Sequence, residues 1–226
     1  MHSALVFDAY GTLFDVHSVL ERCEQFWPGK GAQVSQLWRV KQLEYTWQRS
    51  LMQRYEPFSH VTRDALGYTC EALGLGLDEP RTAALMAQYL DLAPYPDVPP
   101  ALAKFKGPGR KLAILTNGSP DLIAPLVKNC GMQAIFDAVL SVDELRVFKP
   151  APQVYELAVR RLGVPASAIG FVSSNCWDAL AAKSFGFSVY WINRGGAPVD
   201  RIGFQPDGIL KGLGELAARL PGAAQR

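Results

Sequence analysis

The stretch ALVFDAYGTLFD, residues 4–15, begins with a short apolar run, places Asp8 at the end of that run and breaks at Gly11. A near-continuous apolar run of this length predicts a strand buried on both faces, which is typical of a parallel sheet. In open α/β sheets, ligands bind beyond the carboxyl ends of the strands. The stretch therefore predicts the first strand of an α/β core, with a carboxylate at its functional edge. Taken alone, an aspartate in this position is equally well explained as a turn former or a helix cap.

Further short apolar runs predict more strands of the same sheet. They are KLAILTN at 111–117, a weaker run DAVLSV at 137–142, IGFVSSN at 169–175 and SVYWIN at 188–193. Helical patterns separate these runs, and each ends at a glycine, as helices commonly do. They lie at 120–131 after Ser119, which is a good N-cap, at 151–163 and at 176–186. This alternation predicts a doubly wound, Rossmann-like parallel sheet.

Residues 16–93 differ from the rest of the chain because they contain no convincing strand pattern. They predict helices instead, at 18–27, 34–55, 60–75 and 79–92. The proline-rich segment PYPDVPP at 94–100 then predicts a return to the sheet. We therefore expect a catalytic core formed by 1–15 and 94–226, and a helical cap domain, 16–93, inserted after the first strand.

Composition excludes several classes of protein. Hydrophobic residues make up 49% and charged residues 19% of the 226, which is an ordinary globular balance, and disorder is expected only at the tail 221–226. The net charge of +2 and one short basic cluster at 104–111 give no stripe of the kind that binds nucleic acid. No secretion signal and no run of about 20 apolar residues for a membrane span occurs. The four cysteines form no CxxC pair, which favours reduced thiols and a cytoplasmic protein.

Polar residues gather at the predicted carboxyl ends of several strands. Thr116 and Asn117 follow the second run, residues 173–175 follow the fourth, and Lys149 precedes the helix near 151. If these strands lie side by side, the groups converge with Asp8 in one crevice. Several polar strand ends together make a shared site the better interpretation of Asp8.

The motifs DAYGTLFD, LTNGSP, FKPAPQVYELA and FVSSNCWDA resemble, as a set, the haloacid dehalogenase superfamily, and more narrowly its L-2-haloacid dehalogenase branch. The resemblance covers essentially the whole chain, with 16–93 corresponding to the family's cap. It implies an enzyme that converts small L-2-haloalkanoic acids to D-2-hydroxy acids and halide. The implied intermediate is an ester on Asp8, the implied assembly is a homodimer, and neither a metal nor a cofactor is implied.

Tyr10 is the departure that separates this branch from the phosphatases of the superfamily, which carry a second aspartate there and bind Mg²⁺. A phosphate dianion beside an aspartate needs a divalent cation, because two like charges about 4 Å apart repel by about 4 kcal/mol at an effective dielectric near 20. A haloacid carries one charge, and its halide needs no proton to leave. Tyr10 can supply neither a metal ligand nor a proton relay at neutral pH, and offers an apolar ring. A core aromatic is the alternative interpretation.

The resemblance also implies a role for each matching residue. Asp8 is the nucleophile, Lys149 keeps it ionised, and Asp178 activates the water that hydrolyses the ester. The implied catalytic set is Asp8, Thr12, Arg39, Lys149, Tyr155, Ser173, Asn175 and Asp178. The implied substrate-binding set is Ala9, Tyr10, Arg39, Leu43, Phe58, Thr116, Asn117 and Trp177.

Some alternatives stay open on the sequence. A single arginine on a long helix is usually solvated, and Lys41 competes with Arg39 for the anion-binding role. Asp178 also suits the first turn of a helix, where the macrodipole favours a carboxylate, and the identity of the general base is less secure than that of the nucleophile. A phosphatase, or a silent binding protein of the same fold, is the alternative function. The preferred chain length and halogen are not legible in the sequence.

Overall fold

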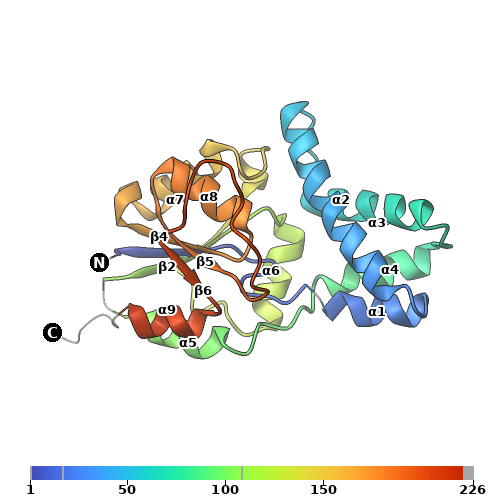
Figure 1. The fold of residues 1–226 in the computed structure, drawn as a ribbon, viewed down its shortest axis with the longest axis horizontal. Coiled ribbons are helices and arrows are strands. Elements are labelled where there is room, and N and C mark those ends of the chain that lie inside the picture. The colour runs from blue at the N-terminus through green and yellow to red at the C-terminus, as the bar shows by residue number, and fades with distance from the viewer. Residues whose placement is uncertain (1, 17, 108, 221–226) are drawn as a thin grey trace.

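The fold is described by a computed structural model for residues 2–16, 18–107 and 109–220 (Figure 1). Within those residues, a six-stranded sheet has the order β3-β2-β1-β4-β5-β6, with every neighbouring pair parallel. The strands are β1 (Ala4–Phe7), β2 (Lys111–Thr116), β3 (Ala138–Ser141), β4 (Ile169–Ser173), β5 (Ser188–Ile192) and β6 (Gly208–Leu210). The predicted doubly wound α/β fold is therefore confirmed. The predicted tail disorder at 221–226 lies outside the described residues.

The strand order sets the place of the site. The chain leaves β1 for β2 on one side and reaches β4 on the other, so β1 and β4 flank the point where the winding reverses. Phe7, the last residue of β1, is level with Ile114 of β2 and Val172 of β4. Asp8 continues the ladder, because its backbone N–H donates to Val172 O at 2.9 Å. Asp8 thus stands at the crevice where doubly wound sheets bind ligands.

Helices cover both faces of the sheet. In Figure 1, α5 and α9 lie on one face, while α7 and α8 lie on the other. The core helices are α5 (Val98–Phe105), α6 (Pro120–Asn129), α7 (Pro152–Leu162), α8 (Cys176–Phe185) and α9 (Leu213–Arg219), with short 3₁₀ helices η1 (Val142–Glu144) and η2 (Ala166–Ala168). Gly163 and Gly186 end α7 and α8 in left-handed conformations, as the sequence predicts.

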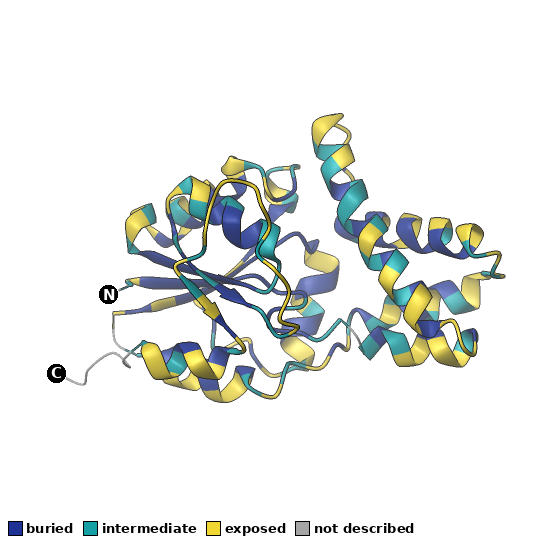
Figure 2. Cartoon of the chain, in the orientation of Figure 1, coloured by how far each residue is buried: buried dark blue, intermediate teal, exposed yellow. Residues whose placement is uncertain are grey.

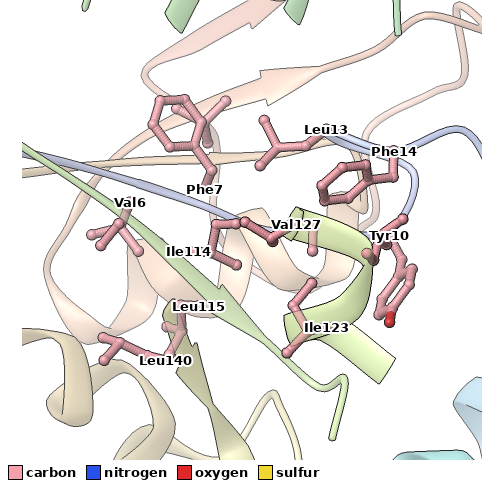
Figure 3. Packing of buried hydrophobic residues seen from close by; sticks show 14 of the residues in the cluster. Val6, Phe7, Tyr10, Leu13, Phe14, Ile114, Leu115, Ile123, Val127 and Leu140 are labelled. Carbon is pink, nitrogen blue, oxygen red and sulfur yellow. The ribbon is translucent and has the colours of Figure 1, made fainter. Parts of the chain in front are cut away.

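The core is formed by the strands and the inner faces of these helices. Figure 2 shows the central strands buried, whereas the edge strands β3 and β6 are partly exposed and most exposed residues of the helices lie on their outer sides. Ile123 and Val127 of α6 lie in the same hydrophobic cluster as Val6 and Ile114 (Figure 3). All four cysteines are free thiols. No helix of the described residues is long and apolar enough to cross a membrane.

The structure also contains elements that the sequence patterns did not predict. β6, α5 and α9 were missed, and α5 begins inside the segment interpreted as a proline-rich connection. Ser119 occupies the N-cap position of α6, but its side chain makes no capping hydrogen bond. Its Oγ instead accepts from the backbone N–H of Ser59 at 3.2 Å. Ser119 is therefore the N-cap residue that the sequence predicts, but its hydroxyl makes a tertiary contact in place of a capping hydrogen bond.

A group of helices lies between β1 and α5, to one side of the sheet (Figure 1). It comprises α1 (Ser18–Phe26), α2 (Gly31–Leu51), α3 (Phe58–Ala72) and α4 (Glu79–Gln88). Two antiparallel stretches join this group to the sheet, with Asp15 N–H donating to Ala93 O at 2.8 Å and Tyr95 N–H to Leu13 O at 3.0 Å. Helices replace strands in this segment, as the sequence predicts. A division into domains at 15/16 and 93/94 stays a prediction.

Candidate active site

Asp8 is held by three side chains. Its Oδ2 accepts hydrogen bonds from Thr12 Oγ1 and from Asn175 Nδ2, each at 2.9 Å. Its Oδ1 lies 3.0 Å from Lys149 Nζ. The carboxylate is largely buried. A buried charge is stable only when it is paired and hydrogen-bonded, and this one is both.

Lys149 lies between two buried carboxylates. Its Nζ is 3.0 Å from Asp8 Oδ1 and 2.9 Å from Asp178 Oδ2, and both the lysine and Asp178 are almost fully buried. Its backbone N–H donates to Asn117 Oδ1 at 2.9 Å, which fixes the chain just after β3 and η1 to the end of β2. The Lys149 ammonium group therefore lies inside the protein and not at its surface.

Burial and charge shift the pKa values of this pair. Burial raises the pKa of Asp178, the Lys149 cation opposes this shift, and the nearby Asp8 charge adds to it. Burial alone would lower the pKa of Lys149, but Asp178 and Asp8 more than reverse that effect and leave it raised. Lys149 is therefore cationic at neutral pH. Asp178 is a stronger base than an ordinary carboxylate, which suits a group that takes a proton from water.

Asp178 is fixed from three sides. Tyr155, in the first turns of α7, donates its hydroxyl to Asp178 Oδ1 at 2.8 Å. Ser173, the last residue of β4, donates to Asp178 Oδ2 at 3.0 Å, opposite the Lys149 contact. Burial and the neighbouring Asp178 raise the pKa of Tyr155, so the hydroxyl remains a donor. These three hydrogen bonds hold the carboxylate in one orientation and leave one of its roughly four acceptor positions open to a further donor.

The turn after β4 connects Asp8 to α8. Asn175 N–H donates to Ser173 Oγ at 3.2 Å, which places the Asn175 side chain above Asp8. Thr12 Oγ1, which donates to Asp8, accepts from the backbone N–H of Ser174 at 2.8 Å. The loop after β1 and the loop after β4 therefore lock each other. Gly11 permits this approach because it has φ +83°, and a Cβ there would come within 3.2 Å of Ser174 Oγ.

Arg39 reaches the site from α2. Its Nη2 donates to Asn175 Oδ1 at 3.4 Å, and its Nη1 donates to Gln42 Oε1 at 3.3 Å. Lys41, the competing cation, pairs with Glu44 at 2.7 Å and lies over the Tyr68 ring instead. The geometry thus places Arg39, and not Lys41, beside Asn175.

Tyr10 is buried at the junction of the sheet and the helices. Its ring stacks on Phe58 of α3, with centroids 5.8 Å apart, and meets the edge of Tyr89 at 6.0 Å. Burial raises the pKa of Tyr10, so its hydroxyl stays neutral. A Cβ added to Gly118 would come within 2.7 Å of the ring, so a glycine is needed there. The side chain is both a core aromatic and part of the wall described next.

Side chains from both parts of the chain enclose one small cavity. It leaves about 10 Å³ for the centre of a water-sized molecule, which is about the room that one water needs. Trp177 of its wall is braced by Trp47 of α2, with ring centroids 5.5 Å apart. The lining residues are Asp8, Tyr10, Arg39, Leu43, Phe58, Thr116, Asn117, Lys149, Asn175 and Trp177. Each of them belongs to the set that the sequence resemblance implies.

The family model for haloacid dehalogenase-like hydrolases matches residues 2–186. The chain belongs to this hydrolase family. It is 50% identical to an (S)-2-haloacid dehalogenase of Pseudomonas sp. (strain YL), over 98% of this chain and 97% of that one. It is 48% identical to an (S)-2-haloacid dehalogenase of Pseudomonas putida, over 94% of each chain.

A solved structure is similar to this hydrolase over almost its full length. It is the L-2-haloacid dehalogenase of Xanthobacter autotrophicus with chloropropionic acid covalently bound. The TM-score is 0.91 with 44% identity, and the match covers 99% of this chain and 100% of that one. The resemblance to the L-2-haloacid dehalogenase branch that the sequence motifs indicate is therefore confirmed.

Other residues of this hydrolase site fall outside the cavity wall. Thr12, Tyr155, Ser173 and Asp178 stand behind it as supports. Ala9 is buried next to Asp8, but its side chain is not among the lining residues. Its carbonyl accepts instead from the backbone N–H groups of the following turn.

Sequence reasoning assigned no role to three residues that hold the site together, although Ser174 lies within the 173–175 strand end expected at the crevice. Ser174 joins Thr12, as described above, and Tyr89 contacts Tyr10. Gln42 is fully buried, accepts from Arg39 and donates to Thr62 Oγ1 at 2.9 Å and to Tyr89 OH at 3.0 Å. One signal for Gln42 was present, because it follows Arg39 by three positions and so shares its helix face.

Proposed function

We propose that this hydrolase converts small L-2-haloalkanoic acids to D-2-hydroxy acids and halide, without a metal, through an ester on Asp8. The observation that carries the proposal is the Asp8 carboxylate, which lines a small cavity and lies 3.0 Å from the Lys149 ammonium group. A desolvated, oriented carboxylate is a competent nucleophile. The similarity to a dehalogenase with chloropropionic acid covalently bound supports the covalent step.

In the first step, an Asp8 oxygen attacks C2 of the haloacid from the side opposite the halogen. The new O–C bond forms as the C–halogen bond breaks, and the electron pair leaves with the halide. One displacement inverts C2, so an L-haloacid yields the D configuration. Thr12 and Asn175 hold the attacking group in place, and alignment of this kind can contribute about 7–11 kcal/mol in favourable cases.

In the second step, water attacks the ester carbonyl carbon of Asp8, and the proton passes to Asp178. The raised pKa of Asp178 makes it a suitable acceptor. The Lys149 cation beside Asp8 Oδ1 stabilises the negative charge that develops on the carbonyl oxygen. When this intermediate collapses, the bond from the Asp8 carbonyl carbon to the ester oxygen breaks, and Asp178 returns its proton to the departing alkoxide. The product leaves as the hydroxy acid, Asp8 keeps an oxygen from water, and the second proton of that water passes to solvent.

Polar side chains of the cavity suit the charged groups of the substrate, and apolar side chains suit its alkyl group. Arg39 and Asn117 offer N–H donors to the halide or the carboxylate, and Thr116 Oγ1, at the end of β2, suits the carboxylate. Leu43, Phe58 and Trp177 form an apolar wall that suits a short alkyl group. Exclusion of water by this wall strengthens each ionic contact inside it.

A metal-dependent phosphatase is the competing function, and two observations favour the dehalogenase. Tyr10 stands where that chemistry needs a second carboxylate. Lys149 Nζ also occupies the space between Asp8 and Asp178, so a divalent cation there would meet a like charge. In the described residues, no group of three or more His, Cys, Asp or Glu side chains could hold a metal ion.

The decisive experiment measures halide release from L- and D-2-chloropropionate, each with and without EDTA. Parallel samples contain p-nitrophenyl phosphate with Mg²⁺. We expect chloride from the L isomer alone, at a rate that EDTA does not change. Phosphate release that requires Mg²⁺, without chloride release, would establish the phosphatase instead.

We further propose that the chain forms a homodimer in the cytoplasm, with 16–93 as its cap domain. Leu51 and Met52, at the far end of α2, are 85% and 60% exposed and provide apolar surface for a second copy. Four free thiols agree with a reducing compartment. Light scattering should give twice the chain mass, and Leu51→Glu should lower it; a monomeric wild type would exclude the dimer.

A further inference from the structure

A second pocket lies on the outer side of Arg39 and takes no part in the proposed reaction. It measures about 300 Å³ and lies between α1 and α2, beside the residue that follows α4. Gln36 and Val40 are exposed at its mouth, while Trp38 and Tyr89 are buried at its base. Its lining residues are Val16, Val19, Ser35, Gln36, Trp38, Arg39, Val40 and Tyr89. We call it the outer pocket.

Arg39 lines both the outer pocket and the inner cavity, so its side chain is shared by the two. A pair of rings also joins their walls, since Tyr89 of the outer pocket meets Tyr10 of the inner cavity at 6.0 Å. The guanidinium hydrogen bonds to Asn175 and Gln42 are 3.4 and 3.3 Å long. Bonds of that length are weak, so the guanidinium group can leave them at low cost.

The size of the inner cavity shows that something must move. Its 10 Å³ admits about one water molecule and no haloacid. The cavity must therefore enlarge before a haloacid can lie beside Asp8. Two movements would admit it: rotation of the Arg39 side chain, or separation of the whole helical segment from the sheet.

The chemistry of the outer pocket suits the proposed substrate. Arg39 is the one charged side chain among its described lining residues, and most of the others are apolar. A carboxylate leaves water only where a cation or hydrogen-bond donors replace its hydration, and a guanidinium group provides both. A small anion with a short apolar tail is therefore the ligand that this lining favours.

We propose that the outer pocket is the access site for the haloacid. The carboxylate pairs with the outer side of the Arg39 guanidinium while the alkyl group rests on the apolar wall. Rotation of Arg39 away from Asn175 and Gln42 then opens the way to Asp8. The identity of the ligand rests on the proposed function, whereas the route rests on the two cavities that share Arg39.

The test narrows the outer pocket without touching the inner one. Ser35 is half-buried and lines only the outer pocket, so Ser35→Phe, and the smaller Ser35→Leu, should obstruct it. Each change is made in an Asp8→Asn background, in which we expect L-2-chloropropionate to bind without turnover. Stopped-flow tryptophan fluorescence gives the association and dissociation rate constants. Gln48→Phe, at an exposed position of α2 that lines neither pocket, is the matched control.

We expect Ser35→Phe to slow association and dissociation together by about tenfold or more, with Kd changed by less than about twofold. Ser35→Leu should have a smaller effect in the same direction, and Gln48→Phe none. Far-UV circular dichroism checks folding. Normal association rates in both folded Ser35 variants would overturn the route and favour opening of the whole helical segment.

Chloride release by the unmodified chain, measured in parallel, separates the two proposals. If that chain releases chloride and the Ser35 variants bind at normal rates, the route fails and the reaction stands. If it releases no chloride but binds the haloacid at rates that depend on Ser35, the proposed dehalogenation is wrong and the proposed access through the outer pocket is supported. Absence of both chloride release and haloacid binding would overturn both.

Discussion

The two parts of the site differ in how firmly they hold their charged groups. Around Lys149, the contacts with Asp8 and Asp178 and the support from Tyr155 measure 2.8–3.0 Å, and all of these groups are buried. Arg39, which comes from α2, is held by two bonds of 3.3 and 3.4 Å. The groups at the ends of the strands are therefore held by short contacts, whereas the Arg39 cation of the helical segment is held by longer ones. Chemistry needs the first property, while capture and release need the second.

The largest effect should come from removing the nucleophile. Asp8→Asn keeps the shape and the acceptors for Thr12 and Asn175, so the fold should persist. Halide release should fall by about 10⁴-fold or more, as when other nucleophiles are lost. The assay uses freshly purified protein, because deamidation would restore the aspartate.

Asp64→Asn provides the control for Asp8→Asn, because Asp64 is an exposed carboxylate paired with Arg49 on the helical segment. Its activity should stay near that of the unmodified chain. If Asp8→Asn retained full activity, the centre on the sheet would not be the place of reaction.

Lys149→Ala should have the next largest effect. It tests whether the part of the site around Asp8 and Asp178 depends on the Lys149 cation. We expect turnover to fall by about 10²–10³-fold, and unfolding to require about 3–5 kcal/mol less, because two buried carboxylates lose their partner. The pKa of Asp178, which burial raises and the Lys149 cation lowers, should then rise further in the folded state, so the variant should regain stability as the pH falls. Chloride release and urea unfolding at two pH values measure both effects.

Lys183→Ala is the matched control, since its pair with Asp207 lies at the surface. Loss of such a pair costs about 1 kcal/mol or less and should leave turnover unchanged. If the two lysine variants lost the same turnover and the same stability, the buried Lys149 cation would have no special role in either.

The sequence predicts the part of the site at the ends of the strands better than the part around Arg39 on α2. Asp8, Thr116 and Ser173 stand at the ends of apolar runs, and a parallel sheet brings such ends together whatever their separation in the chain. The position of Arg39 follows from the family resemblance rather than from its helix. Gln42 and Tyr89 stayed hidden because a buried polar side chain is identified by tertiary partners that no local pattern shows.

The missed elements have local physical reasons as well. β6 has three residues and exposes Ile209, so it lacks the continuous apolar signal of a buried strand. α5 carries its prolines in the first turn, where the missing N–H does no harm, although prolines elsewhere indicate a loop. Ser119 lost its capping role to a contact with Ser59 of α3, and such a contact is absent from any window of sequence.

Tyr155→Phe should have a smaller effect, visible in the pH profile. The Tyr155 hydroxyl lowers the pKa of Asp178, which burial has raised. Without it, Asp178 should take up a proton at higher pH, so the acid limb of kcat should move upward by about one pH unit, the equivalent of one hydrogen bond. Tyr190→Phe, whose hydroxyl contacts His2 before β1, should leave that limb in place. An unmoved limb in Tyr155→Phe would remove Asp178 as the base.

Gln42→Leu should have the smallest effect, and it tests only the part of the site around Arg39. Gln42 accepts from Arg39 and links it, through Thr62, to the backbone carbonyl of Phe58 in the cavity wall. Without that acceptor Arg39 should sample more orientations, and KM should rise by about five- to tenfold with little change in kcat, since about 1 kcal/mol of anion binding is lost. Gln42→Glu should raise KM further, because a carboxylate beside Arg39 neutralises the cation that the substrate needs.

Thr69→Val separates this positioning role from a structural one. Thr69 is also buried, and its hydroxyl donates to Ala65 O within α3, so its loss should lower stability and leave KM unchanged. A purely structural Gln42 would behave in the same way, with a lower melting temperature and a normal KM. If both variants have similar melting temperatures and only Gln42→Leu has a raised KM, the loss of Gln42 acts on substrate binding and not on stability alone. That result would show that Gln42 orients the Arg39 guanidinium from the same helix, α2.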